Sequence, residues 1–129
     1  MDKFKVMIVD DEQDFLETII KRLKARKIDV TGAESGHKAL ELLGAQNFDV
    51  IVLDVKMPGM DGIETLKEIK KRKPLTEVIM LTGHASVESG IQGMQLGAFD
   101  YVMKPAALDE LLEKMRQAYE RKLIQEGKA

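Results

Sequence analysis

The chain has 129 residues, 44% of them hydrophobic and 33% charged, with a net charge of -2 at pH 7. This length predicts a single domain over residues 1–129, with a core at about 4–124 and a tail at 125–129 that frays. The weakly acidic charge argues against direct nucleic-acid binding, and the absence of cysteine excludes disulfides and thiol chemistry. With no signal peptide and no apolar run near the roughly 20 residues of a membrane span, we expect a cytoplasmic protein that does not contact membranes.

Short apolar runs alternate with amphipathic segments along the chain. The expected elements, in order, are a strand at 4–9, a helix at 12–27, a strand at 28–32, a helix at 35–47, a strand at 49–53, a helix at 61–72, a strand at 77–81, a helix at 86–96, a strand at 99–103 and a helix at 108–125. Asp61 followed by Glu64 three residues later predicts a capped start for the third helix.

Strict alternation of strands and helices predicts an α/β fold, with a five-stranded parallel sheet and helices on both of its faces. The runs at 6–9, 50–53 and 78–81 are continuously apolar, as in strands that are covered on both sides. The strands at 28–32 and 99–103 carry polar residues and are expected at the edges. These features predict the flavodoxin-like strand order 2-1-3-4-5.

Several polar residues follow the predicted strands, at the edge of the sheet where such folds bind ligands. Asp10 and Asp11 follow the first strand, Asp54 the third, Thr82 the fourth and Lys104 the fifth. Two carboxylates 4 Å apart repel by about 4 kcal/mol at an effective dielectric near 20, so three together need a cation. Carboxylate oxygens suit Mg²⁺, and the lysine and the threonine suit a phosphoryl group. We therefore expect phosphoryl transfer, with Asp54 as the nucleophile.

The same residues also have plainer interpretations. The acid pair could cap the following helix. Lys104 could be a solvated loop residue and Thr82 an inconsequential strand end, although Gly83 beside it leaves room for a ligand near the backbone. By itself Tyr101 would be sheet packing, and His84 a loop histidine.

Five short motifs occur in order at the ends of the predicted elements: Val9-Asp10-Asp11-Glu12, the stretch from Asp54 to Gly62, Leu81-Thr82-Gly83-His84, the stretch from Gly97 to Tyr101, and Lys104-Pro105. In this arrangement the chain resembles the receiver domain of bacterial two-component response regulators over nearly its whole length. The resemblance implies that Asp54 takes a phosphoryl group from the phosphohistidine of a sensor histidine kinase or a phosphotransfer protein.

The resemblance also implies a magnesium site. Asp11, Asp54 and the backbone carbonyl of Lys56 would bind Mg²⁺, and Asp10 would help through a water molecule. Lys104 would contact the phosphoryl group. The Lys104-Pro105 peptide corresponds to one that is often cis in this family, and an X-Pro bond permits the cis form at modest cost.

Further residues acquire roles through the resemblance alone. Thr82 and Tyr101 would form the switch pair, while Lys56, Gly83 and His84 would flank the phosphoryl group. We expect Lys56 to shield that group from water.

The resemblance implies that switching alters the face formed by the fourth helix, the fifth strand and the fifth helix. That face would bind a downstream protein or a fused output domain, or support a phosphorylation-dependent dimer. Such a domain is not an enzyme in the usual sense, because it catalyses only its own phosphorylation and dephosphorylation. A stand-alone relay and a receiver cut from a longer regulator both fit the sequence.

Two other functions fit parts of the pattern. A flavodoxin-like binder of a small ligand would need a phosphate-binding loop after the first strand, where this chain has three acids. A phosphatase with Asp54 as a transient nucleophile would usually carry a second acid shortly after it, where this chain has Lys56.

Two helices depart from the usual preferences. Gly90 and Gly93 should make the fourth helix the least stable one, at about 0.5–1 kcal/mol each. Ala107 supplies no side-chain cap to the fifth helix, which costs about 1 kcal/mol.

Overall fold

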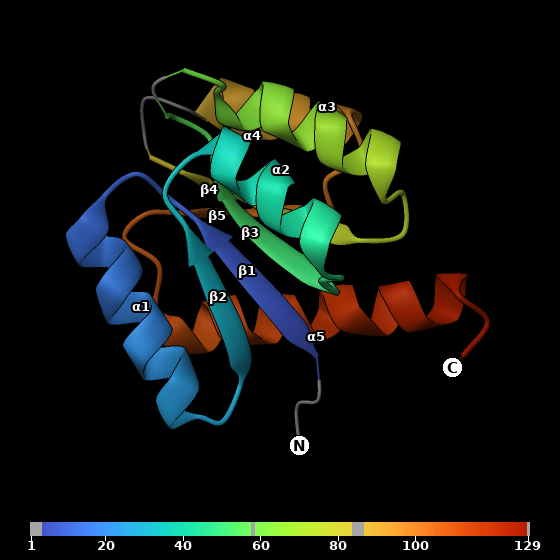
Figure 1. Ribbon diagram of the computed structural model, residues 1–129, viewed down its shortest axis with the longest axis horizontal. Helices are drawn as coiled ribbons and strands as arrows, with labels where there is room; N and C mark the ends of the chain where they lie inside the picture. Colours follow the sequence, from blue (N-terminus) through green and yellow to red (C-terminus); the bar gives the residue numbers. More distant parts are fainter. Residues whose placement is uncertain (1–3, 58, 84–86, 129) are drawn as a thin grey trace.

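The computed structural model describes residues 4–57, 59–83 and 87–128. Its elements alternate as predicted (Figure 1): β1 (Lys5–Val9), α1 (Gln13–Ala25), β2 (Asp29–Ala33), α2 (Gly36–Ala45), β3 (Val50–Asp54), α3 (Gly62–Arg72), β4 (Glu77–Thr82), α4 (Val87–Gln95), β5 (Asp100–Met103) and α5 (Leu108–Gln125). Among these residues, no helix has the length and the apolarity needed to cross a membrane.

The sheet confirms the predicted topology. Its five strands are parallel and lie in the order β2-β1-β3-β4-β5. Every residue of β3 and β4 is buried, whereas β2 and β5 at the edges are only partly buried. Asp54 pairs with Leu81 and Thr82 with Met103, so the carboxyl ends of β3, β4 and β5 reach nearly the same level.

Helices cover both faces of the sheet. Figure 1 shows α1 and α5 on one face and α2, α3 and α4 on the other. Alternate residues of each strand serve the two layers: Val6 and Ile8 belong to the core beneath α1 and α5, and Met7 and Val9 to the opposite core. The two helical layers exclude water from both faces of the sheet, so polar residues gather at the carboxyl ends of its strands.

The helix ends follow the predicted capping. Asp61 caps α3, since its Oδ1 accepts the backbone N–H of Glu64 at 2.9 Å. Ala107 at the start of α5 makes no side-chain cap, as expected. An acid of the first turn of α5, Asp109, instead pairs with Arg26 at the end of α1, at 3.2 Å.

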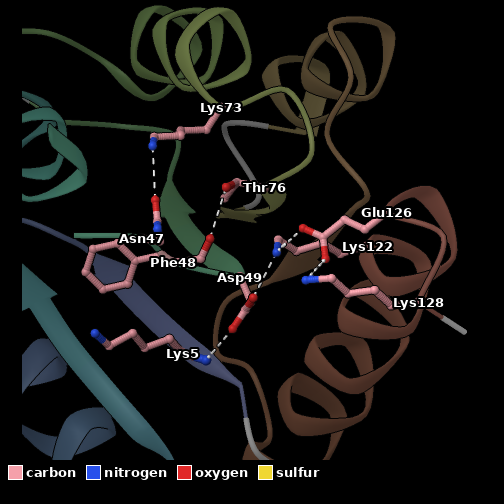
Figure 2. A network of polar contacts seen from close by, with 9 residues as sticks. All are labelled: Lys5, Asn47, Phe48, Asp49, Lys73, Thr76, Lys122, Glu126 and Lys128. Carbon is pink, nitrogen blue, oxygen red and sulfur yellow. Dashed lines mark hydrogen bonds and ion pairs between the residues drawn. The ribbon is translucent and has the colours of Figure 1, made fainter.

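A polar network joins α5 to the amino end of β3, away from the carboxyl edge (Figure 2). Asp49 accepts the backbone N–H of Lys5 at 2.8 Å and pairs with Lys122 Nζ at 3.0 Å. Lys122 also pairs with Glu126 at 2.6 Å, and Glu126 pairs with Lys128 at 3.4 Å. These contacts place residues 126 and 128 against the end of α5, while fraying of the tail stays a prediction.

A buried glutamate links the two helical layers at the same end of the sheet. Glu77, at the start of β4, is 1% exposed. Its carboxylate pairs with Arg121 Nε of α5 at 3.1 Å and with Lys70 Nζ of α3 at 3.8 Å. Burial raises the pKa of Glu77, and the two cations oppose that shift.

Candidate functional site

Three charged residues meet at the carboxyl edge of the sheet, as the sequence predicts. Asp10 directly follows β1, Asp54 ends β3, and Lys104 directly follows β5. The Lys104 ammonium lies 2.7 Å from Asp10 Oδ2 and 3.8 Å from Asp54 Oδ2. The parallel strands therefore bring together residues that are far apart in the chain.

Asp10 belongs to this cluster and does not cap α1. It is fully buried, and its Oδ1 accepts the backbone N–H of Glu12 at 2.9 Å. The helix begins at Gln13, after Glu12 as the N-cap residue. Asp11 is exposed.

Glu12 is part of the site, although the sequence assigned it no role. Its Oε1 accepts a hydrogen bond from Lys104 Nζ at 2.9 Å. Within the described residues, the group of acids able to hold a metal ion consists of Asp10, Glu12 and Asp54, with carboxylate oxygens within 4.8 Å of one another. Asp11 is not in that group. The sequence does contain a signal that could have identified Glu12, because it is the third consecutive acid after β1.

The surroundings of Asp54 disfavour its charged form. The residue is 6% exposed. Burial, and next the charge of Asp10, raise the pKa of Asp54 from 3.8 to about 7, and Asp11 adds to this shift. Lys104 and the backbone N–H of Lys56, which lies 3.3 Å from Asp54 Oδ1, act in the opposite direction. One ammonium thus only partly offsets the acids, and this excess of oxygen ligands suits a hard divalent cation.

Thr82 carries an unsatisfied polar group. The residue is fully buried, and its Oγ1 has no hydrogen-bond partner in the part of the chain that the structure describes. A buried hydroxyl left unpaired costs about 1–3 kcal/mol. The plain interpretation of Thr82 as an inconsequential strand end does not account for this cost.

Helix α4 packs directly against Thr82 and Tyr101. A Cβ atom built at Gly90 would lie 2.8 Å from Thr82 Cγ2 and 3.5 Å from the Tyr101 ring. A Cβ atom at Gly93 would lie 2.9 Å from Met80 Cγ. Both glycines therefore permit a close approach of α4 to β4, which the helix propensities did not reveal.

The remaining predicted residues lie around the same edge. Lys56 is exposed, and Gly83 is half-buried, with open space where a Cβ atom would stand among the described residues. His84 lies outside the described residues. The Lys104-Pro105 peptide is cis, in agreement with the resemblance.

Comparison with protein-family models matches residues 6–116 to the response regulator receiver domain. The chain belongs to this family. Among curated proteins, the receiver domain is 36% identical over 113 residues to the DNA-binding transcriptional regulator NtrC of Escherichia coli K12, which is 88% of this chain and 24% of NtrC. It is 38% identical over 107 residues to the regulatory protein AtoC of the same organism, 83% of this chain and 23% of AtoC.

Solved structures agree with this assignment. A response regulator receiver domain protein from Clostridium thermocellum is 34% identical, with a TM-score of 0.90 and coverage of 95% of this chain and 99% of that one. NtrX from Brucella abortus is 26% identical, with a TM-score of 0.91 and coverage of 98% of this chain and 29% of that one. The receiver domain spans about a quarter of the curated relatives named above, 24% of NtrC and 23% of AtoC.

Proposed function

We propose that this receiver domain accepts a phosphoryl group on Asp54 from the phosphohistidine of a sensor histidine kinase or a phosphotransfer protein. The observation that supports this best is the meeting of Asp10, Asp54 and Lys104, with the ammonium 2.7 Å and 3.8 Å from the two carboxylates. A nucleophile, a positive charge and a surplus of oxygen ligands are the parts that phosphoryl transfer needs.

Mg²⁺ is the proposed cofactor. Asp54 would hold it together with Asp11 and the backbone carbonyl of Lys56, and Asp10 would contribute through water, as the family resemblance implies. When bound, the ion supplies positive charge to the phosphoryl oxygens. With the ion bound, Asp54 would be an anion at neutral pH, because a nearby cation would lower the pKa that burial and Asp10 raise.

In the transfer step, an Asp54 oxygen forms a bond to phosphorus while the bond between phosphorus and the histidine nitrogen breaks. The imidazole leaves with the electron pair of that bond, and the product is an acyl phosphate. The Lys104 ammonium and the Thr82 hydroxyl donate hydrogen bonds to the phosphoryl oxygens. The domain thus catalyses its own modification and, with water as the acceptor, its own dephosphorylation.

The same bonds would drive switching. A change from 1:99 to 99:1 between two conformations needs about 5.5 kcal/mol. Pairing the Thr82 hydroxyl would contribute about 1–3 kcal/mol, and a bond from Lys104 to a charged group about 1.5–3 kcal/mol, less the loss of its contact with Glu12. Tyr101 turns into the space that Thr82 leaves, beside Gly90 of α4.

The proposed output face comprises α4, β5 and α5. It exposes Ile91 and Met94 on α4, with exposed fractions of 48% and 39%. We propose that this face binds a downstream protein or a fused output domain in the cytoplasm, or a second phosphorylated copy. The relative NtrC is named a DNA-binding transcriptional regulator. For a longer chain that contains this receiver domain, we propose a comparable fused output domain.

Labelling with a small-molecule phosphodonor in Mg²⁺ tests the proposed function. Intact mass spectrometry should detect one added phosphoryl group, and peptide mapping should locate it on Asp54. Hydroxylamine should remove it, because it is an acyl phosphate, and EDTA should prevent labelling. Label on another residue, or labelling that resists EDTA, would contradict the proposal.

Lys56→Ala is expected to speed loss of the phosphoryl group by a factor of about 2–10, or about 0.4–1.4 kcal/mol. The exposed Lys56 side chain lies two residues after the acceptor, where it can shield phosphorus from water. The measurement is phosphate release over time after removal of the donor. Lys67→Ala, which alters an exposed lysine of α3, is the control. An unchanged or slower release from the Lys56 variant would refute the shielding role.

A further inference from the structure

The Lys104 ammonium lies closer to the start of α1 than to the acceptor. It is 2.7 Å from Asp10 Oδ2 and 2.9 Å from Glu12 Oε1, but 3.8 Å from Asp54 Oδ2. The Phe15 ring lies beside it as well, with its centroid 4.7 Å from Nζ. Carboxylates and aromatic faces both attract an ammonium. The carboxylates of Asp10 and Glu12 and the ring of Phe15 therefore hold Lys104 beyond hydrogen-bond distance of Asp54.

The start of α1 leaves the Glu12 side chain free for this contact. Glu12 is the N-cap residue, yet its side chain makes no capping hydrogen bond. Its backbone N–H donates to Asp10 Oδ1 at 2.9 Å, which fixes the peptide next to the buried acid. Phe15 follows in the first turn of α1, and both side chains contact the same ammonium.

We infer that Glu12 is a positioning residue that holds Lys104 in the unphosphorylated protein and competes with the phosphoryl group for its ammonium. This inference rests on the proposed function. The Lys104 ammonium has three N–H donors. It donates one hydrogen bond to Glu12 at 2.9 Å and forms an ion pair with Asp10 Oδ2 at 2.7 Å. To bond phosphoryl oxygens on Asp54, the ammonium must move toward the acceptor and weaken its contact with Glu12.

Removal of the Glu12 charge should therefore favour the phosphorylated geometry. Glu12 is 65% exposed, and an exposed ion pair has a small effect, so we expect Glu12→Gln to tighten binding of a phosphoryl analogue about two- to fivefold. The analogue is beryllofluoride, and its affinity is measured by calorimetry at a Mg²⁺ concentration that saturates each variant. Asp14→Asn is the matched control, because it removes another exposed acid from the same turn.

A double-mutant cycle separates this role from a general effect of charge. In a Lys104→Gln background, Glu12→Gln should no longer improve the affinity, because the competition needs the ammonium. A second readout uses the protein without metal or analogue. There, NMR of the lysine side chains should show that the Lys104 ammonium protons exchange with water faster in Glu12→Gln than in the wild type or in Asp14→Asn.

The outcomes distinguish the inference from the proposed function. A wild-type protein that does not bind beryllofluoride in Mg²⁺ would overturn the proposed function and this inference with it. Binding by the wild type without a gain in Glu12→Gln, an equal gain in Asp14→Asn, or a gain that persists without Lys104 would overturn the inference alone.

Discussion

Asp54→Asn is expected to abolish phosphoryl labelling and to stabilise the folded protein by about 2–4 kcal/mol at pH 7 without divalent cations. Labelling is lost because the amide is not a nucleophile for phosphorus. Burial and the charge of Asp10 together raise the pKa of the wild-type Asp54 carboxyl group to about 7. Its charged form therefore destabilises the folded wild type, and the variant is more stable because it lacks that charge. Asparagine keeps the shape of the side chain and removes the charge.

The stabilisation should depend on pH with a defined sign. Because the folded pKa of Asp54 lies above the unfolded value of 3.8, the folded state binds the extra proton between about pH 4 and 7. The wild type therefore loses stability as pH rises through this window, and the loss is complete above about 7. The variant lacks this loss, so the difference between the two proteins should be near zero at pH 3.5 and largest at pH 8.

Urea unfolding of both proteins at several pH values measures this difference. Asp29→Asn, at an exposed aspartate of β2, is the control and should leave stability nearly unchanged. Mg²⁺ should narrow the gap, because a ligand of the folded wild type stabilises it. A gap that does not vary with pH would show that the charge of Asp54 is not its cause.

Gly62→Ala is expected to destabilise the protein by about 2–4 kcal/mol and to slow labelling of Asp54. A Cβ atom at Gly62 would lie 2.4 Å from the Asp54 carbonyl oxygen and 2.6 Å from Val55 Cα. Both are backbone atoms, so a side-chain rotation cannot relieve the overlap. The Gly62 N–H also donates to the Val55 carbonyl at 2.9 Å, which holds the start of α3 against the acceptor strand.

Gly44→Ala in α2 provides the matched comparison for thermal or urea unfolding. Gly44 is exposed, and a Cβ atom there would meet nothing within 4 Å. Alanine at that position should stabilise the helix by about 0.5–1 kcal/mol, since it is the better helix former. Equal effects at the two positions would contradict the packing argument for Gly62.

The sequence predicts the fold well because its local signals agree. Apolar runs of strand length alternate with amphipathic segments, and only a parallel sheet with helical crossovers satisfies that order. The topology then gathers the strand ends, so Asp10, Asp54 and Lys104 could be expected to meet although no local pattern joins them.

Other features depend on side-chain directions and on packing between distant segments. Glu12 stands at a helix start, where periodicity does not define which way a side chain points. Gly90 appeared as a weak point of its helix, because propensity takes no account of the threonine beneath it. Glu77 is an acid at the start of an apolar run, and its buried position depends on Arg121 of α5, which is distant in the sequence.

The two ends of the sheet differ in what their buried polar groups contact. At the amino end, Glu77 Oε2 accepts no hydrogen bond from the described residues but forms an ion pair with Arg121 at 3.1 Å. Asp49, at the same end, is bonded to Lys5 and Lys122, whereas at the carboxyl end the Thr82 hydroxyl has no partner in the described chain. A buried polar group without a partner is stabilised when a rearrangement gives it one. We therefore expect the last turn of α5 to keep its position relative to the sheet while the carboxyl edge rearranges. A segment joined to that turn would then also keep its position relative to the sheet.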